Sequence, residues 1–455
     1  MKKQTHFLAV LSAAAFMALM PPFAGQTGID SAFAASFGWT EEDGSMVYYD
    51  EDGYLTTDSW RKNGDDWYYL GEEGQTVKNA KIDNYYVGED GKMVKDSWVE
   101  LRNEEDPDSP EAPASYWYYF DKDGKSVISR WIRLNEKWYY FDESGHMLTG
   151  KTVIDGATYY LGGEKDGSMK TGWVKLEENA SNPGASEGWY YFNSDGKMVE
   201  TQYDKKIGND YYTFINGKMQ TGWVEMPKAD VSSVSEAGTD SNAAEAPRTI
   251  ADFQYYGEAG DGKRAEGWRI IEGINGIHDM DETFTFFFKA GKAYFSGTKG
   301  NELFTINSKK YAFNDLGEMQ TGRQVVNLGN SEIANFYFGD DGVMKTGKQS
   351  IYNEETGETE NWFFHTDGDK KGQGYHGLRD NVLYLYGKRQ DATAGERYAP
   401  VDLNGVTYLV NTTGNIQKAS ASSTSSEKPE LGRGFKDFKD ANGKIWVVDV
   451  NGTVR

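Results

Sequence analysis

The sequence predicts an all-β protein, a repeat solenoid of stacked β-hairpins that becomes degenerate towards the C-terminus. Three observations lead to this prediction. A tyrosine doublet recurs along the chain, and neighbouring doublets lie 17 to 21 residues apart where nothing is inserted between them. A glycine turn follows most doublets within a few residues. The chain also holds 53 glycines but only 10 prolines, which is typical of many tight turns. The doublets are residues 48–49, 68–69, 85–86, 118–119, 139–140, 159–160, 190–191, 211–212 and 255–256.

Residues 131–150 illustrate one complete repeat. Two short strand candidates, 131–134 and 138–141, flank the polar segment 135–137, which is a hairpin pattern. The segment 144–150 then turns the chain towards the next hairpin. Because side chains alternate along a strand, Trp138 and Tyr140 are expected on one face and Tyr139 and Phe141 on the other. Aromatic residues make up 15% of the chain, so the core of the stack is expected to consist mainly of aromatic rings.

Three long polar insertions fall between the first strand of a repeat and its tyrosine doublet. Each of them, 101–116, 176–188 and 226–252, is therefore expected to lengthen the same hairpin loop. Insertions confined to one loop are tolerated in a repeat array because that loop projects away from the stack.

The expected organisation of the chain follows from this pattern. Residues 1–34 combine a basic start, an apolar run and a small-residue cleavage site at 32–34, which is typical of a secretory signal peptide. After it we expect regular repeats at 35–225, a polar insertion at 226–252, degenerate repeats at 253–418, a Ser-rich linker at 419–434 and a C-terminal cap unit at 435–455.

Composition narrows the classes of partner. The net charge of −23 argues against nucleic acid as a partner and is compatible with a cationic or neutral ligand. The absence of cysteine excludes thiol catalysis and cysteine-based metal sites. No transmembrane segment is expected, so the exported protein would be held at a cell surface non-covalently.

The recurring aromatics allow two interpretations. A Trp leading one strand, a Trp opening the next and a Tyr from the following hairpin could form a three-walled box. Electron-rich ring faces of such a box attract a quaternary ammonium ion, which has no hydrogen-bond donors to satisfy. Alternatively, the same rings only pack the stack. The chemistry of the residues leaves both interpretations open.

Several segments resemble a known repeat. Residues 170–174 (KTGWV), 188–192 (GWYYF) and 195–198 (DGKM) resemble the choline-binding or cell-wall-binding repeat of Gram-positive surface proteins and wall hydrolases. Related repeats occur in glucan-binding proteins and clostridial toxins. The resemblance implies a left-handed solenoid of the choline-binding-repeat type, with choline held between consecutive hairpins by aromatic side chains and sometimes a Met.

Carried over to this sequence, the resemblance implies four cages. They are Trp60, Trp67 and Tyr86; Trp98, Trp117 and Tyr140; Trp131, Trp138 and Tyr160; and Trp173, Trp189 and Tyr212. Met93, Met147, Met169 and Met219 are fourth-wall candidates, with core filling as the alternative. The repeats that start at Lys81, Lys151 and Tyr203 lack the leading Trp. No choline site is expected in the degenerate half.

We therefore predict a secreted, non-catalytic protein without metal or cofactor that binds the bacterial wall through teichoic-acid choline or a related decoration. One alternative is binding of glucan or another extracellular polysaccharide, with the same aromatics as stacking platforms. A further alternative is a wall hydrolase with an active site within 253–418. The acidic residues cluster in turns and insertions rather than forming an evident catalytic pair. The scattered histidines offer no zinc motif.

Overall fold

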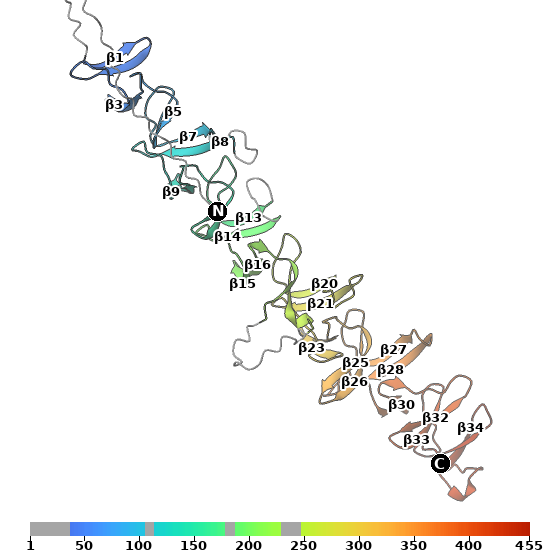
Figure 1. Ribbon diagram of the computed structural model, residues 1–455. Helices are drawn as coiled ribbons and strands as arrows, with labels where there is room; N and C mark the ends of the chain where they lie inside the picture. The colour runs from blue at the N-terminus through green and yellow to red at the C-terminus, as the bar shows by residue number, and fades with distance from the viewer. Residues whose placement is uncertain (1–36, 105–112, 178–186, 229–246) are drawn as a thin grey trace, which may run out of the picture. The chain divides into compact units, whose positions relative to one another are not determined.

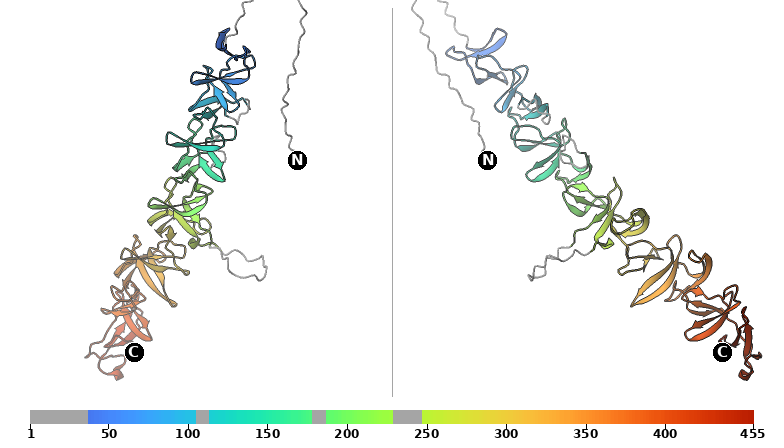
Figure 2. Two further views of the ribbon diagram at one scale, coloured as in Figure 1. Left: turned by 90° about the vertical axis from the view of Figure 1, so that its left-hand side faces the viewer. Right: turned by 45° about the vertical axis from the view of Figure 1, so that its right-hand side comes forward.

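A computed structural model of the chain describes residues 37–104, 113–177, 187–228 and 247–455. The expected signal peptide and most of the three insertions lie outside these residues. The described chain is all-β and consists of repeated antiparallel hairpins, which confirms the predicted hairpin solenoid. It divides into two compact units, residues 1–148 and 149–455. Within each unit the hairpins follow one another in sequence order in every view (Figures 1 and 2).

The first unit contains five hairpins, each formed by two consecutive strands. The strands are β1 (Gly38–Glu42), β2 (Ser45–Tyr49), β3 (Ser59–Asn63), β4 (Asp66–Leu70), β5 (Ala80–Ile82), β6 (Tyr85–Val87), β7 (Ser97–Arg102), β8 (Ser115–Phe120), β9 (Arg130–Leu134) and β10 (Lys137–Phe141).

The second unit continues the pattern and adds two five-stranded sheets, in the orders β13-β14-β17-β16-β15 and β27-β28-β31-β30-β29. Its elements are β11 (Lys151–Ile154), β12 (Ala157–Tyr160), β13 (Gly172–Leu176), β14 (Gly188–Phe192), β15 (Gln202–Ile207), β16 (Asp210–Ile215), β17 (Lys218–Met219), β18 (Gly222–Glu225), η1 (Ile250–Asp252), β19 (Phe253–Tyr256), β20 (Gly267–Glu272), β21 (Thr283–Lys289), β22 (Lys292–Ala293), β23 (Glu302–Ile306), β24 (Lys309–Phe313), β25 (Gly322–Gly329), β26 (Glu332–Phe338), β27 (Gly347–Asn353), β28 (Glu358–Phe364), β29 (Gly377–Arg379), β30 (Val382–Leu385), β31 (Lys388–Arg389), β32 (Tyr398–Leu403), β33 (Val406–Asn411), η2 (Pro429–Leu431), β34 (Phe435–Lys439) and β35 (Ile445–Asp449).

The strands that flank each insertion pair with each other. β7 pairs with β8, β13 with β14, and β18 with β19. Each insertion therefore lies between the two strands of its own hairpin, as predicted. The segment 419–434 forms more than a linker. It contains η2, and the hydroxyls of Ser425 and Ser426 both donate to the Asp437 carboxylate of the last hairpin.

Each hairpin buries one residue near the end of its second strand, which we call the anchor residue. The anchors are fully buried in both units: Leu70, Val87, Phe120, Phe141, Leu161, Phe192, Phe214, Tyr256, Phe288, Phe313, Phe338 and Phe364 have 0% exposure. A bulky apolar side chain at this point removes a large area from water in a thin structure, so the anchors form the core of the stack.

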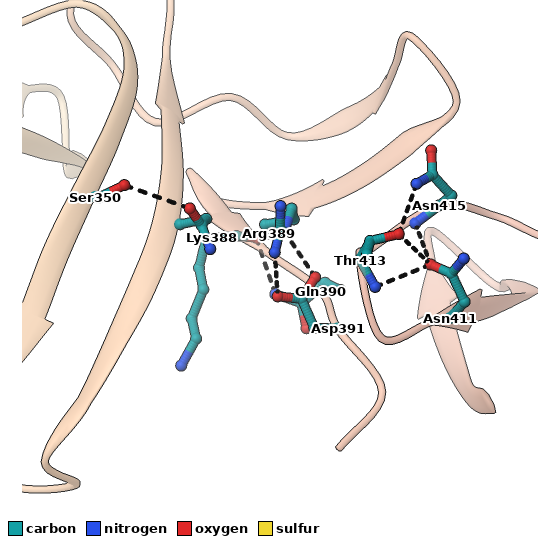
Figure 3. A network of polar contacts seen from close by, with 9 residues as sticks. Ser350, Lys388, Arg389, Gln390, Asp391, Asn411, Thr413 and Asn415 are labelled. Carbon is teal, nitrogen blue, oxygen red and sulfur yellow. Dashed lines mark hydrogen bonds and ion pairs between the residues drawn. The ribbon is translucent and has the colours of Figure 1, made fainter. Parts of the chain in front are cut away.

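The segment after most anchors is closed by an Asx turn. The Asp121 carboxylate accepts the backbone N–H groups of Asp123 and Lys125, both at 3.0 Å. Asn411 does the same for Thr413 and Asn415 (Figure 3), both at 3.0 Å. The Asp or Asn that follows the aromatic strand is thereby explained, because its side chain satisfies two turn amides.

Main-chain hydrogen bonds connect consecutive hairpins. The N–H of Met147, beyond the turn of one hairpin, donates to the carbonyl of Trp117 in the preceding hairpin at 2.8 Å. The same bond joins Met93 to Trp67 at 2.7 Å and Met198 to Thr158 at 2.8 Å. Each bond fixes the distance and register between neighbouring hairpins, and so places their aromatic side chains against each other.

Candidate functional site

The aromatic interfaces between hairpins obey one rule of register. The leading residue of a hairpin is the first-strand residue whose partner on the second strand directly precedes the anchor, as Trp98 pairs with Tyr119 before Phe120. The facing residue lies two positions before the anchor. A leading Trp contacts the facing residue of the next hairpin edge-on or tilted: Trp39 with Tyr68 at 5.4 Å, Trp60 with Tyr85 at 5.4 Å, Trp98 with Tyr139 at 5.0 Å, Trp173 with Tyr212 at 4.8 Å, Trp223 with Phe286 at 5.2 Å and Trp268 with Tyr311 at 4.8 Å between ring centroids. We call these Trp-led interfaces.

The first predicted cage is assembled differently from the expectation. Trp60 contacts Tyr69 of its own hairpin at 5.3 Å and Tyr85 of the next, whereas Tyr86 stacks on Phe120 at 5.9 Å. Trp67 is 36% exposed. The geometric pairing with Tyr86 is therefore wrong, because Tyr86 points to the opposite face of its strand.

The second predicted cage has the same one-residue offset. Trp98 contacts Trp117 at 6.3 Å and Tyr139 at 5.0 Å. Tyr140 instead contacts Trp131 within its own hairpin at 5.2 Å. Met147 is buried in the same cluster. Tyr139 thus replaces Tyr140 as the third wall.

The third predicted set is divided between the two compact units. Trp131 and Trp138 belong to the first unit, where Trp138 is 41% exposed. Tyr160 belongs to the second unit, where its ring lies 6.2 Å from that of Phe192. This set stays a prediction.

The fourth predicted set is brought together in the structure. Trp173 contacts Tyr212 at 4.8 Å and stacks on Phe214 at 5.7 Å. Trp189 and Met219 belong to the same cluster. Tyr212, the second Tyr of its doublet, lies in the facing position here because Thr213 separates it from the anchor Phe214.

A groove opens beside this fourth set. It has a volume of about 800 Å³ and is lined on its apolar side by Trp189, Met219 and Ala259. The polar side is formed by Lys175, Glu187 and Lys218, with Gly188, Thr221 and Gly260 completing the wall. An aromatic wall next to charged groups of both signs suits a small ligand that carries a cation and further polar atoms.

The charged rim of the groove is preformed. Lys175 Nζ donates to Glu187 Oε1 at 2.9 Å. The hydrogen bond to Glu187 raises the pKa of Lys175, and the same bond lowers the pKa of Glu187. Lys175 and Glu187 are therefore both charged at neutral pH.

The methionines serve mainly as packing under turn glycines. A Cβ added to Gly124, Gly196 or Gly262 would lie 2.4, 2.2 or 2.4 Å from the sulfur of Met93, Met169 or Met219, respectively. A glycine is required at these turns because its φ is positive and because the Met side chain lies against it. Met219 alone also lines the groove.

Three Trp-led interfaces were missed in the sequence: those of Trp39, Trp223 and Trp268. Their signal is a Gly-Trp pair in which the glycine adopts a positive φ, 106° at Gly38, 70° at Gly222 and 73° at Gly267. The last two lie beside or within the half that was expected to be degenerate. Trp223 and Trp268 are nevertheless surrounded by Phe rather than by a second Trp. Among the described residues no group of three or more His, Cys, Asp or Glu could hold a metal ion.

Tyr119 is the titratable group through which the Trp98 interface should respond to alkaline pH. It is 7% exposed and contacts Trp98 at 5.2 Å, and its hydroxyl donates to Asp96. Burial, reinforced by that hydrogen bond, raises the pKa of Tyr119 from 10.0 to about 12.

We expect alkaline destabilisation of this interface. The folded pKa is raised, so the stabilisation by neutral Tyr119 is complete below pH 10 and is lost as the pH rises through about 12. Amide exchange of Met147, normalised for the intrinsic rate at each pH, should reveal faster opening over that window. In Tyr119→Phe this pH-dependent component should disappear, and persistence of the full effect would contradict the prediction.

Comparison with known proteins places these hairpins in context. Choline-binding repeat models match residues 54–92 and 127–173, and a cell wall binding repeat model matches residues 185–198. Glucosyltransferase-I of Streptococcus downei is 28% identical over 446 residues, which is 90% of this chain; the chain spans 26% of that protein's length.

Similar solved structures come from Streptococcus pneumoniae. The modular autolysin LytC is 21% identical with a TM-score of 0.37, and the match covers 62% of this chain and 52% of LytC. CbpJ is 18% identical with a TM-score of 0.37, covering 68% of this chain and 100% of CbpJ. In the described residues, no helix has the length and apolar character needed to cross a membrane.

Proposed function

We propose that this chain, in which choline-binding and cell wall binding repeat models match residues 54–92, 127–173 and 185–198, attaches non-covalently to a choline-bearing polymer of the bacterial cell wall. The ligand would bind at Trp-led interfaces. The groove formed by Trp189 and Met219 beside Trp173 and Tyr212 carries this proposal, since it combines ring faces with open volume. We further propose that the protein acts outside the cell, as the predicted signal peptide implies.

In this proposal, each site binds choline weakly and the polymer is held because it engages several sites at once. Trp173 and Tyr212 touch each other, so a trimethylammonium group would lie on their outer side against Trp189 rather than between them. Each ring face supplies about 1–2 kcal/mol, so contact with two or three faces gives a dissociation constant on the order of millimolar. A wall polymer that presents many choline groups would gain affinity by engaging several interfaces of one chain.

The first test is a choline titration of the full secreted chain followed by tryptophan fluorescence. We expect saturable quenching at millimolar choline. The uncharged isostere 3,3-dimethylbutanol, which has the same shape without the cation, should bind at least about fivefold more weakly. Equal responses to both compounds would contradict a cation site, and no response to choline would contradict the proposed ligand.

A carbohydrate ligand is the second candidate. The similarity to glucosyltransferase-I extends along 90% of this chain, and the charged rim of Lys175, Glu187 and Lys218 offers hydrogen bonds to sugar hydroxyls. A series of glucan oligosaccharides run beside the choline titration separates the two candidates. Quenching by oligosaccharides alone would favour the glucan-binding function.

We also propose that the chain has no catalytic activity of its own. Residues 253–418 form hairpins from β19 to β33 in the same pattern as the first unit, so this region offers aromatic interfaces rather than a separate catalytic fold. Zymography on purified walls tests this proposal. A lytic band would contradict it and would support a hydrolase.

A further inference from the structure

Four hairpins that lack a leading Trp carry a basic residue in its place, and in three of them this residue lies over an aromatic ring. Lys81, Lys151 and Arg323 occupy the leading position of β5, β11 and β25, where they pair with Tyr86, Tyr160 and Tyr337. In each case the cationic group lies over the facing residue of the next hairpin: Lys81 Nζ is 4.7 Å from the ring centroid of Tyr118, Lys151 Nζ is 5.8 Å from Tyr190, and the guanidinium carbon of Arg323 is 5.1 Å from Trp362. We call these cation-led interfaces.

The rings beneath these cations are buried. Tyr118, Tyr190 and Trp362 are 7%, 2% and 4% exposed. Turn glycines approach the first two rings, since a Cβ on Gly145 would lie 3.4 Å from Tyr118 Cδ1 and one on Gly217 would lie 3.3 Å from Tyr190 Cδ1. The ring faces are therefore already covered within the chain, and none is free for a second cation.

At cation-led interfaces a different residue stacks on the anchor of the next hairpin. At Trp-led interfaces the leading Trp itself stacks on the next anchor, as with Trp98 on Phe141 at 5.7 Å and Trp173 on Phe214 at 5.7 Å. At cation-led interfaces the Tyr opposite the leading residue takes this place: Tyr86 lies 5.9 Å from Phe120, Tyr160 lies 6.2 Å from Phe192, and Tyr337 lies 6.3 Å from Phe364. The basic side chain is thereby left to contact the facing ring.

The second Trp of the box is missing there too. Three residues before the anchor, cation-led hairpins have Asn84, Thr158 and Asn335, whereas the hairpins led by Trp60, Trp98 and Trp173 have Trp67, Trp117 and Trp189. Within the described ranges, none of the three cations has a carboxylate oxygen within the 4.0 Å of an ion pair. Lys81 Nζ has one further contact, a long one of 3.5 Å to the carbonyl oxygen of Ser144. The aromatic ring is thus the main partner of each cation.

We propose that Lys81, Lys151 and Arg323 are resident cations that occupy the aromatic face of their own interfaces, so that these interfaces act as closed stacking joints and exclude an external quaternary ammonium ion. The exclusion rests on the proposed function, whereas the stabilising contact does not. The leading residue and the ring that it faces then determine which interfaces of the chain accept ligand: those led by Trp remain available, and those led by Lys81, Lys151 and Arg323 are already filled.

The stabilising contact is tested by hydrogen exchange on the full chain. The Ser126 N–H donates to the Asn84 carbonyl at 2.7 Å across the interface of Lys81, so its exchange rate reports the opening of this joint. Loss of an exposed cation–π contact in Lys81→Gln should accelerate Ser126 exchange about 2–5-fold. Lys81→Arg should restore the wild-type rate. The Met147 amide, which bonds across the Trp98 interface at 2.8 Å, should be unchanged in both variants.

Lys348 provides a matched control. It is an exposed basic leading residue of β27, but the facing residue of the next hairpin is Val382, which has no ring. Lys348→Gln should leave amide exchange around its own interface unchanged. Unchanged Ser126 exchange in Lys81→Gln, or an equal effect of Lys348→Gln on its own interface, would overturn the proposal.

Choline stoichiometry tests the exclusion. By equilibrium dialysis with labelled choline, Lys81→Gln should bind the same number of choline molecules per chain as the wild type. A lost choline would show that the Lys81 interface was a ligand site and would overturn the exclusion. If the wild type binds no choline at all, the proposed function fails, while the exchange experiment still decides whether the cations hold the joints.

Discussion

Trp189→Ala is expected to weaken ligand binding in the groove while leaving the hairpin stack folded, whereas Trp173→Ala is expected to impair both binding and folding. Trp189 lines the groove, and its ring forms an outer wall. Trp173 lies deeper, between Tyr191 at 5.1 Å, Tyr212 at 4.8 Å and Phe214 at 5.7 Å. Loss of one cation-binding ring face at Trp189 should weaken choline binding at this site by about 5–30-fold.

The two variants should differ clearly in stability. Truncation of a packed Trp costs about 3–5 kcal/mol, which we expect for Trp173→Ala, against about 1 kcal/mol for the more peripheral Trp189. Indole N–H signals in NMR spectra follow each Trp separately, so the choline-dependent shift of the neighbouring Trp173 can be read in Trp189→Ala. An unchanged choline response of Trp173 in that variant would show that the groove is not the ligand site.

Trp98 supplies a comparison within the other unit. There the two Trp rings contact each other at 6.3 Å, and the facing Tyr139 completes the cluster. If both interfaces bind choline, Trp98 and Trp173 should show parallel shifts in the wild type. Only the Trp173 shift should be lost in Trp189→Ala, because the Trp98 site is made of different residues.

The period of the doublets was sufficient to predict the hairpins and their order. Short strands, glycine turns and insertions in one loop are local features, and the structure reproduces them from β1 to β28. Alternation within a strand also separated Tyr139 from Tyr140 correctly, since one contacts Trp98 and the other Trp131.

The sequence could not show which of the two tyrosines faces the preceding hairpin. That choice depends on the register between hairpins, which is fixed by bonds such as Met147 N–H to the Trp117 carbonyl. Such a bond joins main-chain atoms, so the types of the residues do not reveal it. Counting back two positions from the buried anchor, rather than from the doublet, identifies the facing residue in both cases, Tyr139 before Phe141 and Tyr212 before Phe214.

The contacts of the basic leading residues with aromatic rings could not be predicted from the sequence either. A missing Trp at Lys81 or Lys151 suggested an incomplete repeat, because nothing in a single sequence indicates where a long flexible side chain ends. Only the structure shows that Lys81 reaches Tyr118 in the next hairpin. Repeats that lack the leading Trp therefore keep an ordered interface by another interaction.

The largest effect on the stack itself is expected from Gly374→Ala in the segment between β28 and β29, next to the second five-stranded sheet. A Cβ at Gly374 would lie 2.4 Å from the carbonyl oxygen of Tyr386, 2.7 Å from its carbonyl carbon and 2.9 Å from the nitrogen of Gly387. These are backbone atoms, so no change of rotamer relieves the overlap. The turn between β30 and β31, which contains Gly387, must move away. This turn is held by the bond from Gly387 N–H to the Tyr375 carbonyl at 2.7 Å and by the bond from Phe363 N–H to the Gly387 carbonyl at 2.8 Å.

Breaking or stretching these two bonds, together with the Gly374 N–H bond to the Asn335 carbonyl at 2.8 Å, should cost about 3–4 kcal/mol. Exchange of the Phe363 amide should then accelerate by about two orders of magnitude. Gly368→Ala is the matched control, because Gly368 has a φ of +69° but no atom within 4 Å of an added Cβ. It carries backbone strain alone, which is about 1 kcal/mol and is confined to its turn. Gly374 does not have a positive φ, so equal effects of the two substitutions on Phe363 exchange would contradict the prediction that close approach to the Tyr386–Gly387 turn requires a glycine at position 374.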